Sequence, residues 1–154
     1  MTEDELFARR PMGMRMAMVV RQWRAIIDAA ITDTGLTQSS WTVLMQLYQL
    51  GDNVSVSELA QVQGIELPPL MRTLSQLEKH GYLLRTTSPY DKRIRLLTLT
   101  AQGRTRLEEL NRLIENYQHR VTSTIPEAEL AAFSSTLNQL ACNLRTIREE
   151  DNQH

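Results

Sequence analysis

In the middle of the chain, apolar positions recur every three or four residues over two short stretches, which is the spacing of amphipathic helices. Ser55 and Glu58 have the spacing of a capping box, which satisfies free backbone donors where a helix begins. The pattern predicts a helix over about residues 56–63. Gly64 then supplies the permissive backbone that a sharp turn between two helices requires.

A second helix is predicted over about residues 67–79. Pro68 and Pro69 fit only its first turn, because farther along their rings and missing N–H groups would break a helix. Apolar side chains spaced three or four positions apart predict its inward face: Leu70, Leu74 and Leu77. Arg and Gln side chains on the opposite face can bind base edges, and a helix fits the major groove of double-stranded DNA. The candidate DNA contacts of this helix are Leu67, Pro68, Pro69, Arg72, Thr73, Gln76 and Lys79. In an isolated helix, the same residues would also be typical of a solvated face.

Two strand-like runs follow, at residues 83–87 and 94–100, and a polar turn-forming segment separates them. They predict a β-hairpin whose cations suit a flanking minor groove and phosphates: Lys92, Arg93 and Arg95. We expect Asp91 to cap the turn or to pair with Arg93. The order helix, turn, helix and basic hairpin is typical of a winged helix-turn-helix.

Long amphipathic patterns flank this central region. A helix over about residues 5–32 and a final helix that begins after Pro126 both carry apolar stripes. The stripe residues that we assign to dimerisation are Met16, Val19 and Trp23, and Leu130, Phe133, Leu137, Leu140, Leu144 and Ile147. A small winged domain could not cover all of them, which favours a homodimer, although Trp23 is also compatible with ordinary core packing. The alternative is that the helices fold back as a bundle within one chain.

Three sequence segments around the hairpin carry a family resemblance: SELAQVQGIELPPLMRTLSQLEKHGYLLR, then DKR at the turn, then LTLTAQG. They contain the motifs Asp91-x-Arg93 and Leu99-Thr100-x-x-Gly103. The pattern resembles the MarR family of bacterial transcription regulators over about residues 12–148. Upstream, residues 20–28 and the motif Leu36-Thr37-Gln38-x-x-Trp41 are similar to the SlyA branch of that family.

This resemblance implies a mainly α fold with a small β wing, and a dimer formed by the N- and C-terminal helices. We expect a single domain over residues 1–154, with a DNA-binding lobe at about 36–100 and a dimerisation lobe at about 5–35 and 101–150. Such a homodimer would bind a palindromic operator, as a repressor or by displacing a silencing protein. A protein-interaction module on the same fold is the alternative.

The resemblance also implies a ligand. Regulators of this kind often respond to small aromatic carboxylates or phenols, and the SlyA-like positions that match are Arg24 and Trp41. Met45 stands where that branch usually has histidine. Core packing is an equally good interpretation of Trp41.

Charge is unevenly distributed along the chain. The whole sequence has a net charge of −1, but residues 66–95 contain six basic and three acidic side chains, a net charge of +3. The positive charge therefore lies where the helix and hairpin are expected to contact DNA.

The remaining chemistry-bearing residues suggest neither catalysis nor a cofactor. His80, His119 and His154 lack metal-ligand spacing, we expect His80 and His154 at the surface, and no nucleophile or phosphate-loop motif is present. We therefore predict that the protein is not an enzyme. The single cysteine, Cys142, lies in an apolar helical pattern and is predicted to be a buried structural thiol. No apolar run approaches the ~18 residues of a membrane span, which favours a cytoplasmic protein.

Overall fold

The computed structural model describes residues 1–153, and His154 lies outside them. Contacts divide the chain into two compact units, residues 1–117 and the segment that begins at Gln118. No helix within residues 1–153 is long and apolar enough to cross a bilayer.

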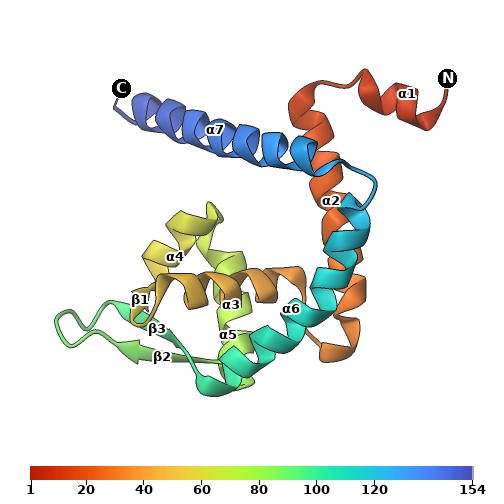
Figure 1. Cartoon of the computed structure of the whole chain (residues 1–154). Helices are drawn as coiled ribbons and strands as arrows, with labels where there is room; N and C mark the ends of the chain where they lie inside the picture. Colours follow the sequence, from red (N-terminus) through yellow and green to blue (C-terminus); the bar gives the residue numbers. More distant parts are fainter. Residues whose placement is uncertain (154) are drawn as a thin grey trace. The chain divides into compact units, whose positions relative to one another are not determined.

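The fold is mainly helical with one small sheet, which confirms the predicted fold class (Figure 1). In chain order the elements are α1 (Glu3–Ala8), α2 (Met12–Ala30), the 3-10 turn η1 (Thr32–Thr34), α3 (Gln38–Leu50), β1 (Val54–Ser55), α4 (Val56–Gln63), α5 (Leu67–Lys79), β2 (Leu83–Thr87), β3 (Arg95–Leu99), α6 (Ala101–Thr122) and α7 (Glu127–Asp151).

The helix-turn-helix forms where the sequence places it. The Ser55 hydroxyl accepts a hydrogen bond from the Glu58 N–H at 3.1 Å, and the Glu58 carboxylate accepts one from the Ser55 N–H at 3.2 Å. Gly64 ends α4 in the left-handed region, with a φ of 65° that costs a residue without a Cβ little. Helix α5 then begins with two prolines in its first turn.

The sheet has three antiparallel strands in the order β1, β3, β2. Leu83 pairs with Leu99 at one end of the β2–β3 hairpin, and Thr87 pairs with Arg95 at the other. The two-residue strand β1, which the sequence did not predict, pairs Val54 with Leu97. The start of α4 is therefore joined to the same strand that forms one side of the wing.

One hydrophobic core lies among α3, α5, the sheet and the first part of α6. The inward stripe of α5 is fully buried in it, as are the core residues of α3 and α6: Leu70, Leu74, Leu77, Leu44, Leu47, Leu110 and Ile114. Burial of each such Leu or Ile side chain stabilises the fold by about 1.5–3 kcal/mol relative to leaving it exposed. This core sets the orientation of α5.

The single N-terminal helix predicted over about residues 5–32 is wrong, because the chain breaks between α1 and α2. Pro11 has the extended ψ of 147° and serves as the N-cap of α2. Proline has no N–H to donate, and its ring disfavours helical backbone at the preceding residue, Arg10. A continuous helix through residues 9–11 would therefore lack the backbone hydrogen bond that the N–H of residue 11 normally donates.

Helix α7 contains no buried residue. Its apolar stripe includes four exposed side chains: Phe133, Leu137, Leu144 and Ile147. The prediction that Cys142 is a buried thiol is wrong for the chain described here, since Cys142 is exposed on this helix. The apolar residues around Cys142 therefore form an exposed face of α7.

Candidate nucleic-acid interface

Helix α5 presents a polar face on the side opposite its buried stripe. Arg72, Gln76 and Lys79 are exposed there, and Leu67, Pro68 and Pro69 are exposed at its N-terminal end. Thr73 is half-buried, and its hydroxyl donates to the Pro69 carbonyl at 3.3 Å. All predicted contact residues of this helix except Thr73 are therefore exposed.

The other end of α5 is tied to the sheet. Arg85 on β2 donates to the Glu78 carboxylate at 3.1 and 3.2 Å and to the Ser75 hydroxyl at 3.4 Å. Of the six cations in residues 66–95, Arg85 is thus a bracing residue. This pair joins the end of α5 to β2, one strand of the wing.

The wing ends in an ordered turn between β2 and β3. Asp91 accepts three hydrogen bonds from Arg93: one from the backbone N–H at 3.0 Å, and one each from Nε and Nη2 at 3.1 Å. These bonds hold the pKa of the Asp91 carboxyl below its ordinary value, with the side-chain bond as the larger cause. The Arg93 side chain is nevertheless 90% exposed. Its guanidinium is positioned and remains accessible.

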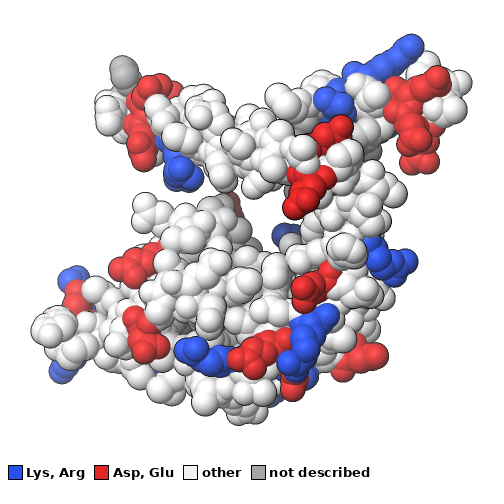
Figure 2. Space-filling view, in the orientation of Figure 1, with Lys and Arg blue, Asp and Glu red and all other residues white. Residues whose placement is uncertain are grey.

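Arg95, at the base of the turn, donates to the Thr87 hydroxyl across the hairpin, while Lys92 is exposed at the tip. Figure 2 shows Lys and Arg side chains on both sides of the projecting wing, at the left of the view. The cations Lys92, Arg93 and Arg95 of the wing thus lie in the turn and at the start of β3.

Helix α5 and the wing meet at a shallow pocket of about 220 Å³. Met71 of α5, Val56 at the start of α4, and Arg93 and Arg95 of the wing all line it. The pocket shows that α5 and two cations of the wing, Arg93 and Arg95, are neighbours. A ligand long enough to lie along α5 would also meet the wing.

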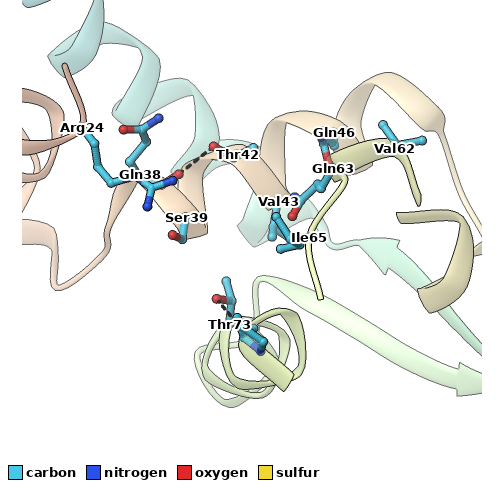
Figure 3. A pocket seen from close by; sticks show the side chains of 11 residues that line it. Arg24, Gln38, Ser39, Thr42, Val43, Gln46, Val62, Gln63, Ile65 and Thr73 are labelled. Carbon is cyan, nitrogen blue, oxygen red and sulfur yellow. Dashed lines mark hydrogen bonds between the residues drawn. The ribbon is translucent and has the colours of Figure 1, made fainter. Parts of the chain in front are cut away.

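A second cavity, of about 270 Å³, lies on another side of α5. Figure 3 shows side chains from α2, α3, the end of α4, the α4–α5 turn and α5 around it. The lining consists of Arg24, Gln38, Ser39, Thr42, Val43, Gln46, Val62, Gln63, Ile65, Pro69 and Thr73. Arg24 is its cation. Pro69 and Thr73 belong to the recognition helix, so this cavity borders the candidate DNA-binding surface.

Three glutamine side chains in this cavity have buried polar atoms without a hydrogen-bond partner among residues 1–153. These atoms are Oε1 of Gln38, Oε1 of Gln46 and Nε2 of Gln63. A buried polar atom without a partner is costly, which favours occupancy by a polar molecule. The sequence reasoning missed these residues, although Gln38, Thr42 and Gln46 are spaced at i, i+4 and i+8 along one helix face.

Two predicted ligand contacts do not line this cavity. The Trp41 indole N–H donates to Asn111 Oδ1 of α6 at 2.8 Å, and Met45 packs against the core. Only Arg24 of the three is in the lining. Trp41 therefore links α3 to α6, and the proposed aromatic stacking has no support from its present position.

The residues assigned to dimerisation also differ in exposure. Met16 and Val19 are exposed on α2, whereas Trp23 packs against the core. On α7, Leu130 and Leu140 are half-buried and the other four are exposed. No group of three His, Cys, Asp or Glu side chains within residues 1–153 could hold a metal ion.

Known proteins share both this sequence pattern and this fold. The MarR family model matches residues 36–94, which span the helix-turn-helix and most of the wing. The solved transcriptional regulator PA3341 is 30% identical, with 88% of this chain and 99% of that chain aligned at a TM-score of 0.77.

Two further solved structures show the same fold at lower identity. A structure of MarR aligns over 92% of this chain and 96% of its own, at 21% identity and a TM-score of 0.84. A mutant MarR from Escherichia coli, complexed with operator DNA, aligns over 84% and 93% at 24% identity and a TM-score of 0.76. The family model, the relative at 30% identity and the winged-helix fold agree, and the chain belongs to the MarR family.

Proposed function

We propose that this protein is a sequence-specific transcription regulator that binds double-stranded DNA. The observation that carries the proposal is the joint surface of α5 and the wing, where Met71, Arg93 and Arg95 line one pocket beside the exposed face of the recognition helix. A family relative complexed with operator DNA supports it. The protein would act without catalysis, in the cytoplasm and on nucleoid DNA.

In the proposed complex, α5 enters the major groove and the wing reaches the flanking minor groove. Arg72 and Gln76 have side chains that can bind base edges in pairs of hydrogen bonds, and the Thr73 methyl suits a thymine methyl. Lys79, Lys92 and Arg95 suit phosphates, and Arg93 suits a narrow minor groove. Binding there would exclude polymerase or a silencing protein.

The protein is proposed to bind as a homodimer on a palindrome. The apolar side chains that α2 and α7 expose, among them Val19, Phe133 and Leu144, support this assembly because they would lose contact with water between two copies. Two recognition helices related by a two-fold axis would then contact successive major grooves. We also propose the SlyA-like branch, on the residues 20–28 and the Trp41 motif.

A titration tests DNA binding directly. A labelled fragment of the DNA that flanks the gene is titrated at two salt concentrations with nonspecific competitor, beside the double variant Arg72→Ala, Arg93→Ala. Competitor-resistant binding by the wild type that the double variant loses is the expected result. A wild type no better than competitor on this fragment and on duplexes selected from a random library would contradict the proposal.

The interaction-module alternative makes the opposite prediction. In that case the two arginines would contribute little to any nucleic-acid affinity, and the double variant would bind DNA as weakly as the wild type does.

A second proposal concerns regulation by a small aromatic carboxylate or phenol. The cavity that contains Arg24 supports it, since a carboxylate could pair with this guanidinium while its other polar groups satisfy Gln38 and Gln46. Because Pro69 and Thr73 border the cavity, a ligand there would favour one position of α5 over another.

Calorimetry with salicylate as the probe tests this ligand. Arg24→Ala and Gln46→Leu should each weaken its binding at least tenfold, while Gln49→Leu, an exposed glutamine of the same helix, should leave it unchanged. Equal affinity in all four proteins would place the ligand elsewhere.

A further inference from the structure

The wing tip carries an aromatic side chain that the rest of the protein does not cover. Tyr90 is 97% exposed, whereas Tyr82 is buried, Tyr117 is half-buried and Tyr48 is 53% exposed beneath Arg104. Within residues 1–153 its hydroxyl makes no hydrogen bond and its ring stacks on no other ring. A tyrosine ring is amphipathic and is enriched where proteins meet partners.

The backbone around Tyr90 is well ordered by hydrogen bonds. The Ser88 hydroxyl accepts from the N–H groups of Tyr90 and Asp91, at 3.2 and 3.4 Å, and Ser88 itself is buried. The Ser88 N–H donates to the Ile94 carbonyl at 2.9 Å, and the Ile94 N–H donates to the Asp91 carbonyl at 3.0 Å. The tip therefore holds the Tyr90 ring away from the protein instead of letting it fold back.

The surroundings of Tyr90 identify the partner by charge. Lys92 and Arg93 lie two and three positions later, and Arg93 is fixed by Asp91 with its guanidinium exposed. Cations next to an uncovered phenol suit a polyanion with apolar edges, and DNA offers both in phosphates and deoxyriboses. Tyrosine hydroxyls are among the groups that bind phosphate and sugar oxygens in DNA complexes.

We propose that Tyr90 is a further DNA contact, which packs its ring on the deoxyriboses of the minor groove that flanks the site read by α5. Its hydroxyl donates to a phosphate of the same stretch. The inference rests on the proposed DNA-binding function. Because the ring neutralises no phosphate, it contributes affinity that salt does not weaken, unlike the contribution of Lys92.

The test begins with duplexes that the wild-type protein selects from a random library. Affinity for a selected duplex is measured at four salt concentrations for the wild type, Tyr90→Ala and Tyr90→Phe, and hydroxyl-radical cleavage records which sugars each protein protects. Lys92→Ala serves as the control for a lost phosphate contact, and Tyr48→Ala as the control for a lost exposed tyrosine.

The expected result for Tyr90→Ala is about tenfold weaker binding, an unchanged slope of affinity against salt, and lost protection of sugars at both flanks. Tyr90→Phe should stay within about threefold of the wild type and keep the protection, whereas Lys92→Ala should flatten the slope. Tyr48→Ala should bind as the wild type does.

Two results would overturn the inference while the proposed function stands. In one, Tyr90→Ala binds within twofold of the wild type with the same protected sugars. In the other, it weakens binding but flattens the salt slope as Lys92→Ala does, which would mean that the substitution only displaces a cation. A wild type that selects no sequence would overturn the proposed function and this inference with it.

Discussion

Arg85 and Glu78 form a two-point ion pair that joins β2 to the last turn of the recognition helix, with nitrogen–oxygen distances of 3.1 and 3.2 Å. The Arg85 side chain is only 18% exposed. The pair thus connects the end of α5 directly to the wing.

Arg85→Ala is expected to lower the free energy of unfolding by about 1 kcal/mol, because the Glu78 carboxylate loses two charge-assisted hydrogen bonds from a partly buried guanidinium. Urea unfolding measures the change. Lys79→Ala, which removes an exposed cation of the same region, should change stability by less than about 0.5 kcal/mol. If Glu78→Ala and the double variant show purely additive losses, the pair does not contribute as a unit.

Close packing around Gly103 accounts for the glycine in the motif Leu99-Thr100-x-x-Gly103. A Cβ at this position would lie 1.9 Å from the Tyr82 carbonyl oxygen and 2.8 Å from Leu99 Cδ1. The Gly103 N–H also donates to the Thr100 hydroxyl at 3.0 Å, and that hydroxyl donates to the Gly81 carbonyl at 2.6 Å. The start of α6 can therefore approach the chain before β2 only without a side chain.

Gly103→Ala should destabilise the protein by ~2 kcal/mol or more, because backbone atoms have to move. Thermal unfolding beside Gly13→Ala gives a matched comparison. Gly13 lies in α2 with no atom near its Cβ position, so alanine there should raise stability by about 0.5–1 kcal/mol. Equal melting temperatures for the two variants would contradict this account of the motif.

The pKa of Asp91 reports on the wing tip. Its pairing with Arg93 lowers the folded-state pKa below 3.8, so the pairing favours the folded state above the unfolded pKa and is lost as pH falls through the folded value. Carboxyl NMR titration should show this depressed pKa in the wild type and a higher pKa in Arg93→Ala, which loses the side-chain bonds and keeps the backbone N–H that also lowers the pKa. The wing should keep its geometry between about pH 5 and 8. A wild-type pKa at or above the ordinary value would indicate that the pair does not form in solution.

Base reading and phosphate binding can be separated by two substitutions. Arg72→Ala should reduce discrimination at one base pair of the operator by ~1–3 kcal/mol, because a bidentate contact is lost. Lys92→Ala should weaken all sequences alike and reduce the salt slope by about one unit. Competition binding with single-base operator variants measures both, and full discrimination by Arg72→Ala would exclude its role in base reading.

The helix-turn-helix could be predicted from the sequence because local chemistry sets its boundaries. Ser55 with Glu58 begins α4, Gly64 ends it, and Pro68 can lie only at the start of α5, so the expected ranges match those observed. The break at Pro11 carried the same kind of signal, and the apolar stripe of α2 obscured it.

Features assembled from distant segments could not be predicted in the same way. Strand β1 has two residues and exists through its pairing with Leu97, so its own pattern carries no strand signal. The cavity that contains Arg24 combines α3 with the end of α4, and only the fold brings Gln46 near Gln63. Trp41 matched a family position, but its hydrogen bond to Asn111 depends on where α6 lies.

The pairing of Val54 with Leu97 has a consequence for how such a protein can diverge. It joins the helix-turn-helix to the middle of β3, so the turn between Thr87 and Arg95 is the part of the wing that lies beyond the paired strands. We expect exchanges in the exposed part of that turn, at residues such as Tyr90 and Lys92, to leave the position of α5 unchanged. In the proposed complex, the sequence preference of the wing could therefore evolve independently of the bases that α5 contacts.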